Sequence, residues 1–123
     1  MTGGSGVGRA AIGTVSGSSI SFLDGAYVFS SAADVEQINV QVLSSSRFVL
    51  FYSDDDNNGH MACKIGIRND GNDIRFTPAA PLPGDSYSGS MAFMSPTRFI
   101  MGYGQHSPNR GKLNVADIVG DTI

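Results

Sequence analysis

The chain has 123 residues, and its eight Lys and Arg against eleven Asp and Glu give a formal net charge of −3. This length suits one domain, and the lack of a basic cluster excludes the phosphate recognition on which nucleic-acid binding depends. No apolar run approaches the roughly 20 residues of a membrane span, so we expect a soluble protein without membrane insertion, secreted or cell-surface associated if its ligand is a cell-surface glycan.

The N-terminal part is predicted to hold a tail, two strands and a link. Residues 1–6 (MTGGSG) are glycine-rich and are predicted to be a flexible tail. Residues 7–35 form an outer-strand segment and link, with strands near 10–15 and 19–23. The helix signal is weak, and only residues 31–37 (SAADVEQ) resemble a capped helical turn.

Residues 36–87 are predicted to form a first repeat of four strands. Alternation of apolar and polar residues, β-branched enrichment and turn residues set the boundaries. The second strand is apolar on both faces, which is typical of a sheet packed on both sides. The four strands lie near 38–43, 48–52, 61–67 and 74–77.

A second, incomplete repeat is predicted over residues 88–123. The link that precedes it, 78–88, holds three prolines. Because proline cannot donate to a strand ladder, we expect this link to run outside the sheets.

Two sequence blocks recur along the chain. Residues 43–52 (LSSSRFVLFY) return as 94–103 (MSPTRFIMGY), an offset of 98 − 47 = 51 residues between the arginines. Residues 12–20 return near 65–74 and begin again near 116–123. A period of about fifty residues indicates a repeat array.

Four antiparallel strands followed by a longer crossover predict an all-β fold of β-propeller blades, two four-stranded blades in each chain. A β-trefoil is the alternative, although its repeat of about forty residues is shorter. A ring usually takes roughly four to eight blades, so we expect a homo-oligomer, with a trimer favoured. About ten strands are predicted where two blades need eight. Either a terminal segment crosses to a neighbouring chain or the chain belongs to a longer array.

Three stretches resemble the tandem propeller repeats of many bacterial and marine proteins, and the resemblance extends over nearly the whole chain. They are residues 13–22 (GTVSGSSISF), 27–31 (YVFSS) and 43–54 (LSSSRFVLFYSD). The two-blade length is also similar to that of the bacterial fucose-binding propeller lectins, which trimerise into six blades with sugar sites within and between blades. Those sites use tryptophan, and this chain has none, so no binding residue is carried over.

An arginine and a tyrosine recur at identical spacing, as Arg47 with Tyr52 and as Arg98 with Tyr103. A guanidinium fork and a phenol suit sugar hydroxyls or carboxylates, so these four are candidate ligand-binding residues. The alternative is that the tyrosines belong to the core, because residues shared by repeats often serve the fold.

His60 and His106 flank the same type of hairpin in the two repeats and complete the candidate ligand-binding set. A catalytic role would need a nucleophile and an orienting carboxylate nearby, and the sequence indicates neither. No enzyme activity is therefore predicted.

The acidic loop that begins at Asp54 has the form D-x-D-x-N-G. Its candidate ligands for calcium are Asp54, Asp56 and Asn58, since hard cations prefer oxygen donors around a tight glycine turn. Ile65 stands where a bidentate glutamate would be expected. The alternative is a solvated hairpin tip, and no other cofactor is predicted.

These patterns favour multivalent recognition of cell-surface carbohydrate by a homo-oligomeric propeller, in which several shallow sites would act together. The alternative is a non-catalytic structural or assembly repeat module of an adhesin or fibre protein.

Overall fold

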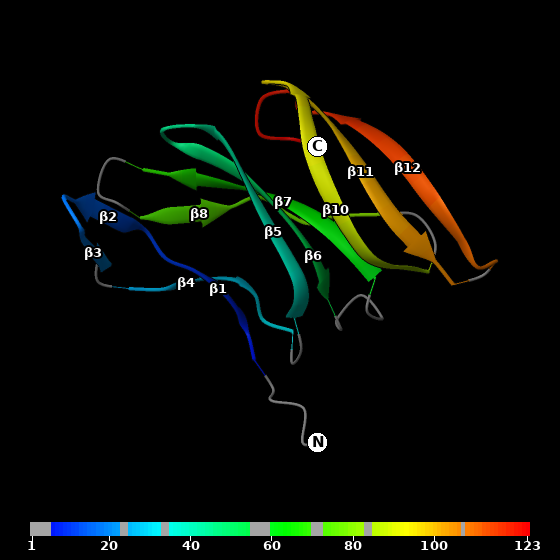
Figure 1. The fold of residues 1–123 in the computed structure, drawn as a ribbon, viewed down its shortest axis with the longest axis horizontal. Coiled ribbons are helices and arrows are strands. Elements are labelled where there is room, and N and C mark those ends of the chain that lie inside the picture. The colour runs from blue at the N-terminus through cyan, green and yellow to red at the C-terminus, as the bar shows by residue number, and fades with distance from the viewer. Residues whose placement is uncertain are drawn as a thin grey trace.

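The fold is all-β, with several antiparallel sheets (Figure 1). A computed structural model describes residues 6–22, 25–32, 35–54, 60–69, 73–82, 85–106 and 108–123. Residues 1–5 of the predicted tail lie outside these ranges. Within them, no helix is present that could cross a membrane.

The first repeat forms the central sheet. Its strands, in spatial order, are β5 (Val35–Ser44), β6 (Arg47–Asp54), β7 (His60–Arg68) and β8 (Ile74–Phe76). All four predicted strands are therefore confirmed. β5 to β7 extend beyond the predicted ends because their polar end residues still pair across the ladder.

The proline-rich link does not run wholly outside the sheets. Its residues Ala80–Pro81 form β9, which pairs with β7 at the sheet edge, where Pro81 lies opposite Ala62. An edge strand tolerates proline because one side of it has no neighbour to receive a hydrogen bond. The next residue, Leu82, donates its N–H to the carbonyl of Met61 over 2.9 Å.

The second repeat forms the C-terminal sheet, with strand order β10 (Ser86–Ser95), β11 (Arg98–Gln105) and β12 (Arg110–Asp117). After β12 the chain makes a tight turn closed by a bridge between Val119 and Thr122. Three strands of the predicted incomplete repeat are thus present.

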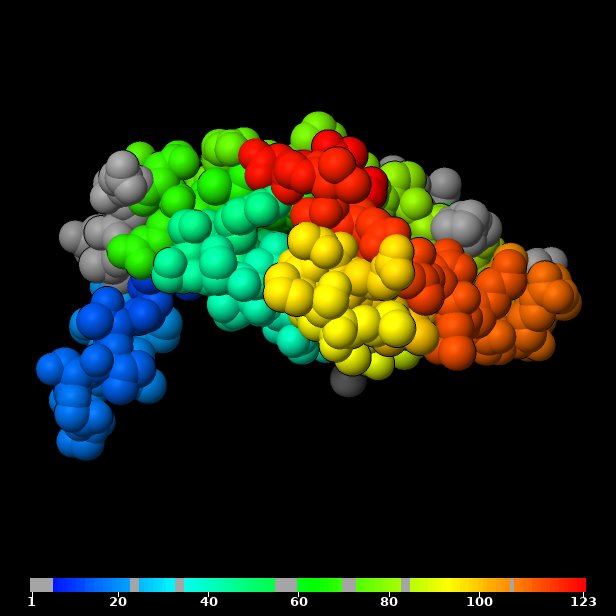
Figure 2. Space-filling model, turned by 90° about the horizontal axis from the view of Figure 1, so that it is seen from above, coloured from blue at the N-terminus to red at the C-terminus, as the bar shows by residue number. Residues whose placement is uncertain are grey.

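Near the N-terminus, β1 (Gly8–Ala10) pairs with β4 (Tyr27–Ser30), and β2 (Gly13–Ser16) pairs with β3 (Ser19–Phe22). The β2–β3 hairpin projects away from the body of the molecule (Figure 2). The strand predicted near 19–23 is found as β3, whereas the one predicted near 10–15 is divided between β1 and β2, which belong to different sheets. The expected link after them contains β4. The helical turn suggested for residues 31–37 is not formed by its described part, because β5 begins at Val35.

Equivalent strand pairs show the repeat in three dimensions. Val40 lies opposite Leu50 in the central sheet, as Met91 lies opposite Met101 in the C-terminal sheet, 51 residues later (91 − 40). The β10–β11 hairpin is therefore the counterpart of the β5–β6 hairpin.

The N-terminal strands are a partial third copy. Arg9 lies opposite Val28 in the β1–β4 pair, as Ala62 lies opposite Pro81 in the β7–β9 pair, 53 residues later (62 − 9). β1 is thus the counterpart of the beginning of β7, the third strand of a repeat.

Both long hairpins carry the same irregularity. The ladder between β5 and β6 shifts register around Gln37, which has a φ of 52°, and the ladder between β10 and β11 shifts around Ser88, which has a φ of 37°. The two residues are 51 positions apart (88 − 37). A bulge with one left-handed residue is therefore part of the repeat.

The main core lies between the two large sheets. We name the surface of the central sheet that meets the C-terminal sheet its front face, and the opposite surface its rear face. The buried front face includes Val49, Phe51, Met61, Cys63 and Ile65. The rear face of the C-terminal sheet packs against it through Met91, Phe99, Met101 and Tyr103.

A second, smaller core lies on the rear face of the central sheet. Leu50, Tyr52 and Ala62 are buried there beneath Phe29 of β4. The Phe29 and Tyr52 rings meet edge to face, with centroids 5.0 Å apart. The central sheet therefore presents its rear face to the N-terminal segment and its front face to the C-terminal sheet. The ranges described form this open stack, and they form no closed ring.

Candidate functional site

The repeated arginine and tyrosine do not come together. Arg47 and Tyr52 lie on one strand, β6, an odd number of residues apart, so their side chains leave opposite faces of the sheet. Arg98 and Tyr103 have the same relation on β11. Neither repeat therefore gathers this pair into one sugar site.

Both tyrosines belong to the cores. Tyr52 is fully buried on the rear face of the central sheet, and Tyr103 is buried between the two large sheets. Burial, together with the nearby Asp54 carboxylate, raises the pKa of the Tyr52 hydroxyl above its usual range. The alternative stated for the tyrosines, a core role, agrees with this placement.

The arginines form ion pairs. Arg47 contacts Asp121 with a 3.1 Å distance between Nη2 and Oδ1, and it also donates to the carbonyl of Gly120. Asp121 also pairs with Arg75, with 2.9 Å between its Oδ2 and Nη2 of Arg75. Arg47 therefore ties the central sheet to the turn that follows β12.

Arg98 lies opposite Asp117 across β11 and β12, and it donates to both carboxylate oxygens over 2.6 and 2.9 Å. The hydrogen bond from Arg98 lowers the pKa of Asp117 below its ordinary value of 3.8. Both side chains are about half exposed, so this two-pronged pair lies at the surface.

The structure describes only one of the three predicted calcium ligands, Asp54. Asp56 and Asn58 lie outside the described residues. Asp54 is buried at the end of β6, where its Oδ2 accepts a hydrogen bond from the Ser30 hydroxyl over 2.8 Å. Elsewhere in the described ranges no cluster of three or more His, Cys, Asp or Glu could hold a metal. Calcium binding through this loop stays a prediction.

The two histidines occupy different surroundings. His60 is half-buried at the start of β7, whereas His106 is exposed just after β11. The His106 ring stacks on Tyr87, with centroids 3.9 Å apart and an angle of 24° between the planes. Tyr87 in turn lies over Gly104, where a Cβ would come within 2.6 Å of its ring.

Comparison with known proteins finds no matching family model, no matching curated protein and no matching solved structure.

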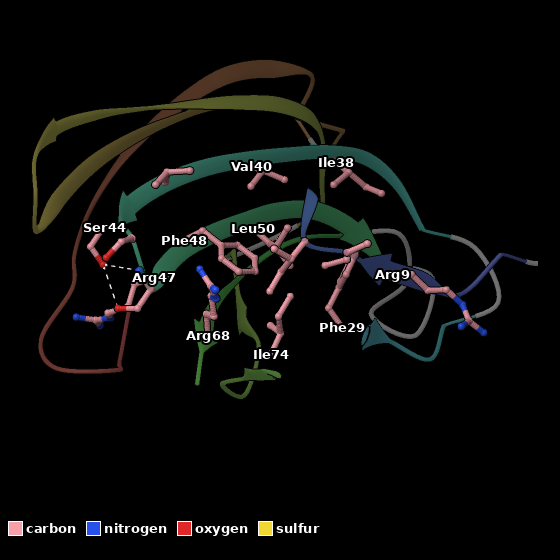
Figure 3. A pocket seen from close by; sticks show the side chains of 16 residues that line it. Arg9, Phe29, Ile38, Val40, Ser44, Arg47, Phe48, Leu50, Arg68 and Ile74 are labelled. Atoms are coloured by element: carbon pink, nitrogen blue, oxygen red, sulfur yellow. Dashed lines mark hydrogen bonds between the residues drawn. The ribbon is translucent and has the colours of Figure 1, made fainter. Parts of the chain in front are cut away.

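An apolar groove lies on the rear face of the central sheet, and we name it the rear groove. It has a volume of about 500 Å³. One wall is β5 with Ile38, Val40 and Val42, and the floor includes Phe48 and Leu50 (Figure 3). The lining also includes Arg68, Ile74 and the segment 9–12, which begins in β1.

A second bare apolar surface is the front face of the C-terminal sheet. Leu113 and Val115 of β12 are exposed there, next to the half-buried Ile100 of β11, which lies opposite Val115. This surface faces away from the central sheet, whose front face holds the counterparts of the same residues.

The sequence pattern predicts the strands that carry these two bare surfaces, but it does not predict that the surfaces are exposed. The alternation of Val40 and Val42 with polar neighbours predicted β5 correctly, and it says that one face is apolar. It does not say whether anything covers that face, because cover comes from residues distant in the chain. The repeat was the signal that could have shown it, since it marks Val40 as the counterpart of Met91.

Proposed function

We propose that this chain is a non-catalytic assembly module whose sheets stack face to face with those of further copies. One comparison within the chain supports it. Ile65, on the front face of the central sheet, is 0 % exposed, whereas Val115, its counterpart on the C-terminal sheet, is 57 % exposed. A surface that one repeat buries and the next leaves bare fits a repeat array in which each unit contacts its neighbours.

The chemistry of the bare surfaces favours association over catalysis or polar recognition. Branched aliphatic side chains make up much of both surfaces, although Arg9 and Arg68 also line the rear groove. Contiguous apolar surface on a protein marks interaction sites. Carbohydrate binding stays a prediction. It would need several polar groups converging on one ligand, and the arginines and tyrosines considered for it lie on opposite sheet faces.

The test is the mass of the purified chain in solution, measured by light scattering over a wide concentration range. We expect assemblies above the 12.9 kDa of one chain, and three times that mass for a trimeric ring. A cooperatively melting monomer at every concentration would overturn the assembly function.

A further inference from the structure

Resting on the proposed assembly function, we infer that copies of this chain associate head to tail. In this contact the front face of the C-terminal sheet in one copy packs into the rear groove of the central sheet in the next copy. The two surfaces that meet are different, so the interface is heterologous and either closes into a ring or continues as a filament.

The rear groove has the character of a surface that a front face covers. Val40 on its β5 wall is 54 % exposed, while its counterpart Met91 on β10 is 7 % exposed. Met91 is buried because it packs against the front face of the central sheet. Unlike Met91, Val40 is not covered by the front face of another sheet.

The front face of the C-terminal sheet has the complementary character. Leu113 is 72 % exposed, whereas its counterpart Cys63 is 1 % exposed. The Cys63 thiol lies 3.3 Å from the sulfur of Met101, and Met101 is the counterpart of Leu50 on the groove floor. Within one chain Ala10 of β1 already packs against Leu50 in the same way, so the front face of a neighbouring copy meets the groove along its β5 wall, at Val40 and Val42.

The N-terminal segment shows which strands are missing beside the groove. β1 is the counterpart of the third strand of a repeat, and its edge away from β4 has no paired strand among the described residues. Among the described residues, the places that the first and second strands of a repeat would take beside β1 are thus open. Because β1 itself fills the place of a third strand, it is β12 of a neighbouring copy, with its exposed Leu113 and Val115, that would enter the open place beside β1.

The test uses one exposed residue on each surface, so that the fold is kept. Val42→Arg places a charge in the rear groove, and Val115→Arg places one on the front face beside Ile100. An unpaired charge at an apolar contact carries a large desolvation cost. Val119→Arg, at an exposed position of the C-terminal turn, is the control and should assemble like the wild type.

Each blocked variant alone should be monomeric by light scattering, with an unchanged circular dichroism spectrum. An equimolar mixture of Val42→Arg and Val115→Arg should form a species of twice the mass of one chain, because one intact groove and one intact front face remain. An interface between two identical faces would instead leave one variant dimeric on its own.

Continued dimerisation of either variant, or a mixture that stays monomeric, overturns the head-to-tail contact. These outcomes are distinct from failure of the proposed function, which would show as a wild-type chain that never assembles.

Discussion

The thiol of Cys63 is sealed inside the core between the two large sheets. Burial raises the pKa of this thiol to about 12, so the reactive thiolate is scarce at neutral pH. We expect a thiol reagent such as dithionitrobenzoate to leave the native chain unlabelled at pH 8 and to label one equivalent at once in denaturant. Any slow labelling of the native chain should occur only at the rate at which the two large sheets separate.

The repeat offers a matched control for this prediction. Leu113 is the counterpart of Cys63 on the bare front face, so Leu113→Cys in a Cys63→Ala background should react immediately in dilute solution. Rapid native labelling of the wild type would contradict the burial of Cys63. Equal protection of the two cysteines in the monomer would contradict the exposure of the front face.

Also at the scale of residues, the sugar site predicted from the repeated arginine and tyrosine is not formed. The strand prediction already gave the reason. Arg47 and Tyr52 recur together, but an odd separation on a strand places two side chains on opposite faces. Recurrence showed that both residues serve something shared by the repeats. Only packing shows that Tyr52 serves the core while Arg47 holds Asp121.

At the scale of elements, strands with their own sequence pattern could be predicted, whereas β4 and β9, which depend on distant partners, could not. β5 to β8 follow from alternation and turn residues within the sequence. β4 and β9 have only a few residues each, and they are strands because β1 and β7 offer them an edge. Such pairing partners are distant in the chain, so local pattern does not report them.

The bulge shared by β5 and β10 is invisible in the sequence because neither Gln37 nor Ser88 is a residue type that signals positive φ. A left-handed conformation costs a non-glycine residue roughly 1 kcal/mol. We expect Gln37→Gly to stabilise the fold by up to about 1 kcal/mol, partly offset by the entropy of glycine in the unfolded chain. Gln37→Val should destabilise it by at least about 1 kcal/mol, since β-branched residues tolerate this region poorly.

The order should reverse on the same strand outside the bulge. Gln41 lies opposite Val49 in a regular stretch of the ladder, so valine should be better than glycine there. Urea unfolding of the four variants gives the comparison. The same preference for glycine over valine at Ser88 would establish the bulge as a repeated feature, whereas valine equal to glycine at Gln37 would argue against the left-handed geometry.

At the scale of the whole molecule, the sequence predicted the all-β class, and the stacking of sheets within one chain follows from the repeat. Local pattern does not fix how many copies an assembly of the proposed kind would contain, because that number depends on the angle at which one sheet meets the next. A blade closes a ring only if that rotation divides the circle. Under the proposed assembly function, further sheets would be added at the bare surfaces that carry Val40 and Leu113.

The two large sheets should unfold as one unit, because they share one core and Phe51 lies at its centre. The backbone of β10 passes so close that a Cβ on Gly89 would lie 3.0 Å from the Phe51 ring. Phe51→Ala should destabilise the fold by about 3–5 kcal/mol, and Phe51→Leu, which keeps more of the volume, by about 1 kcal/mol. Val115→Ala, on the bare counterpart surface, should change stability by less than about 0.5 kcal/mol in the monomer.

Urea unfolding followed by circular dichroism and by tyrosine fluorescence should give coincident single transitions for the wild type and for Phe51→Leu. Separate transitions for the two signals would mean that each sheet is stable without the other, and the shared core would then not be what holds the stack together.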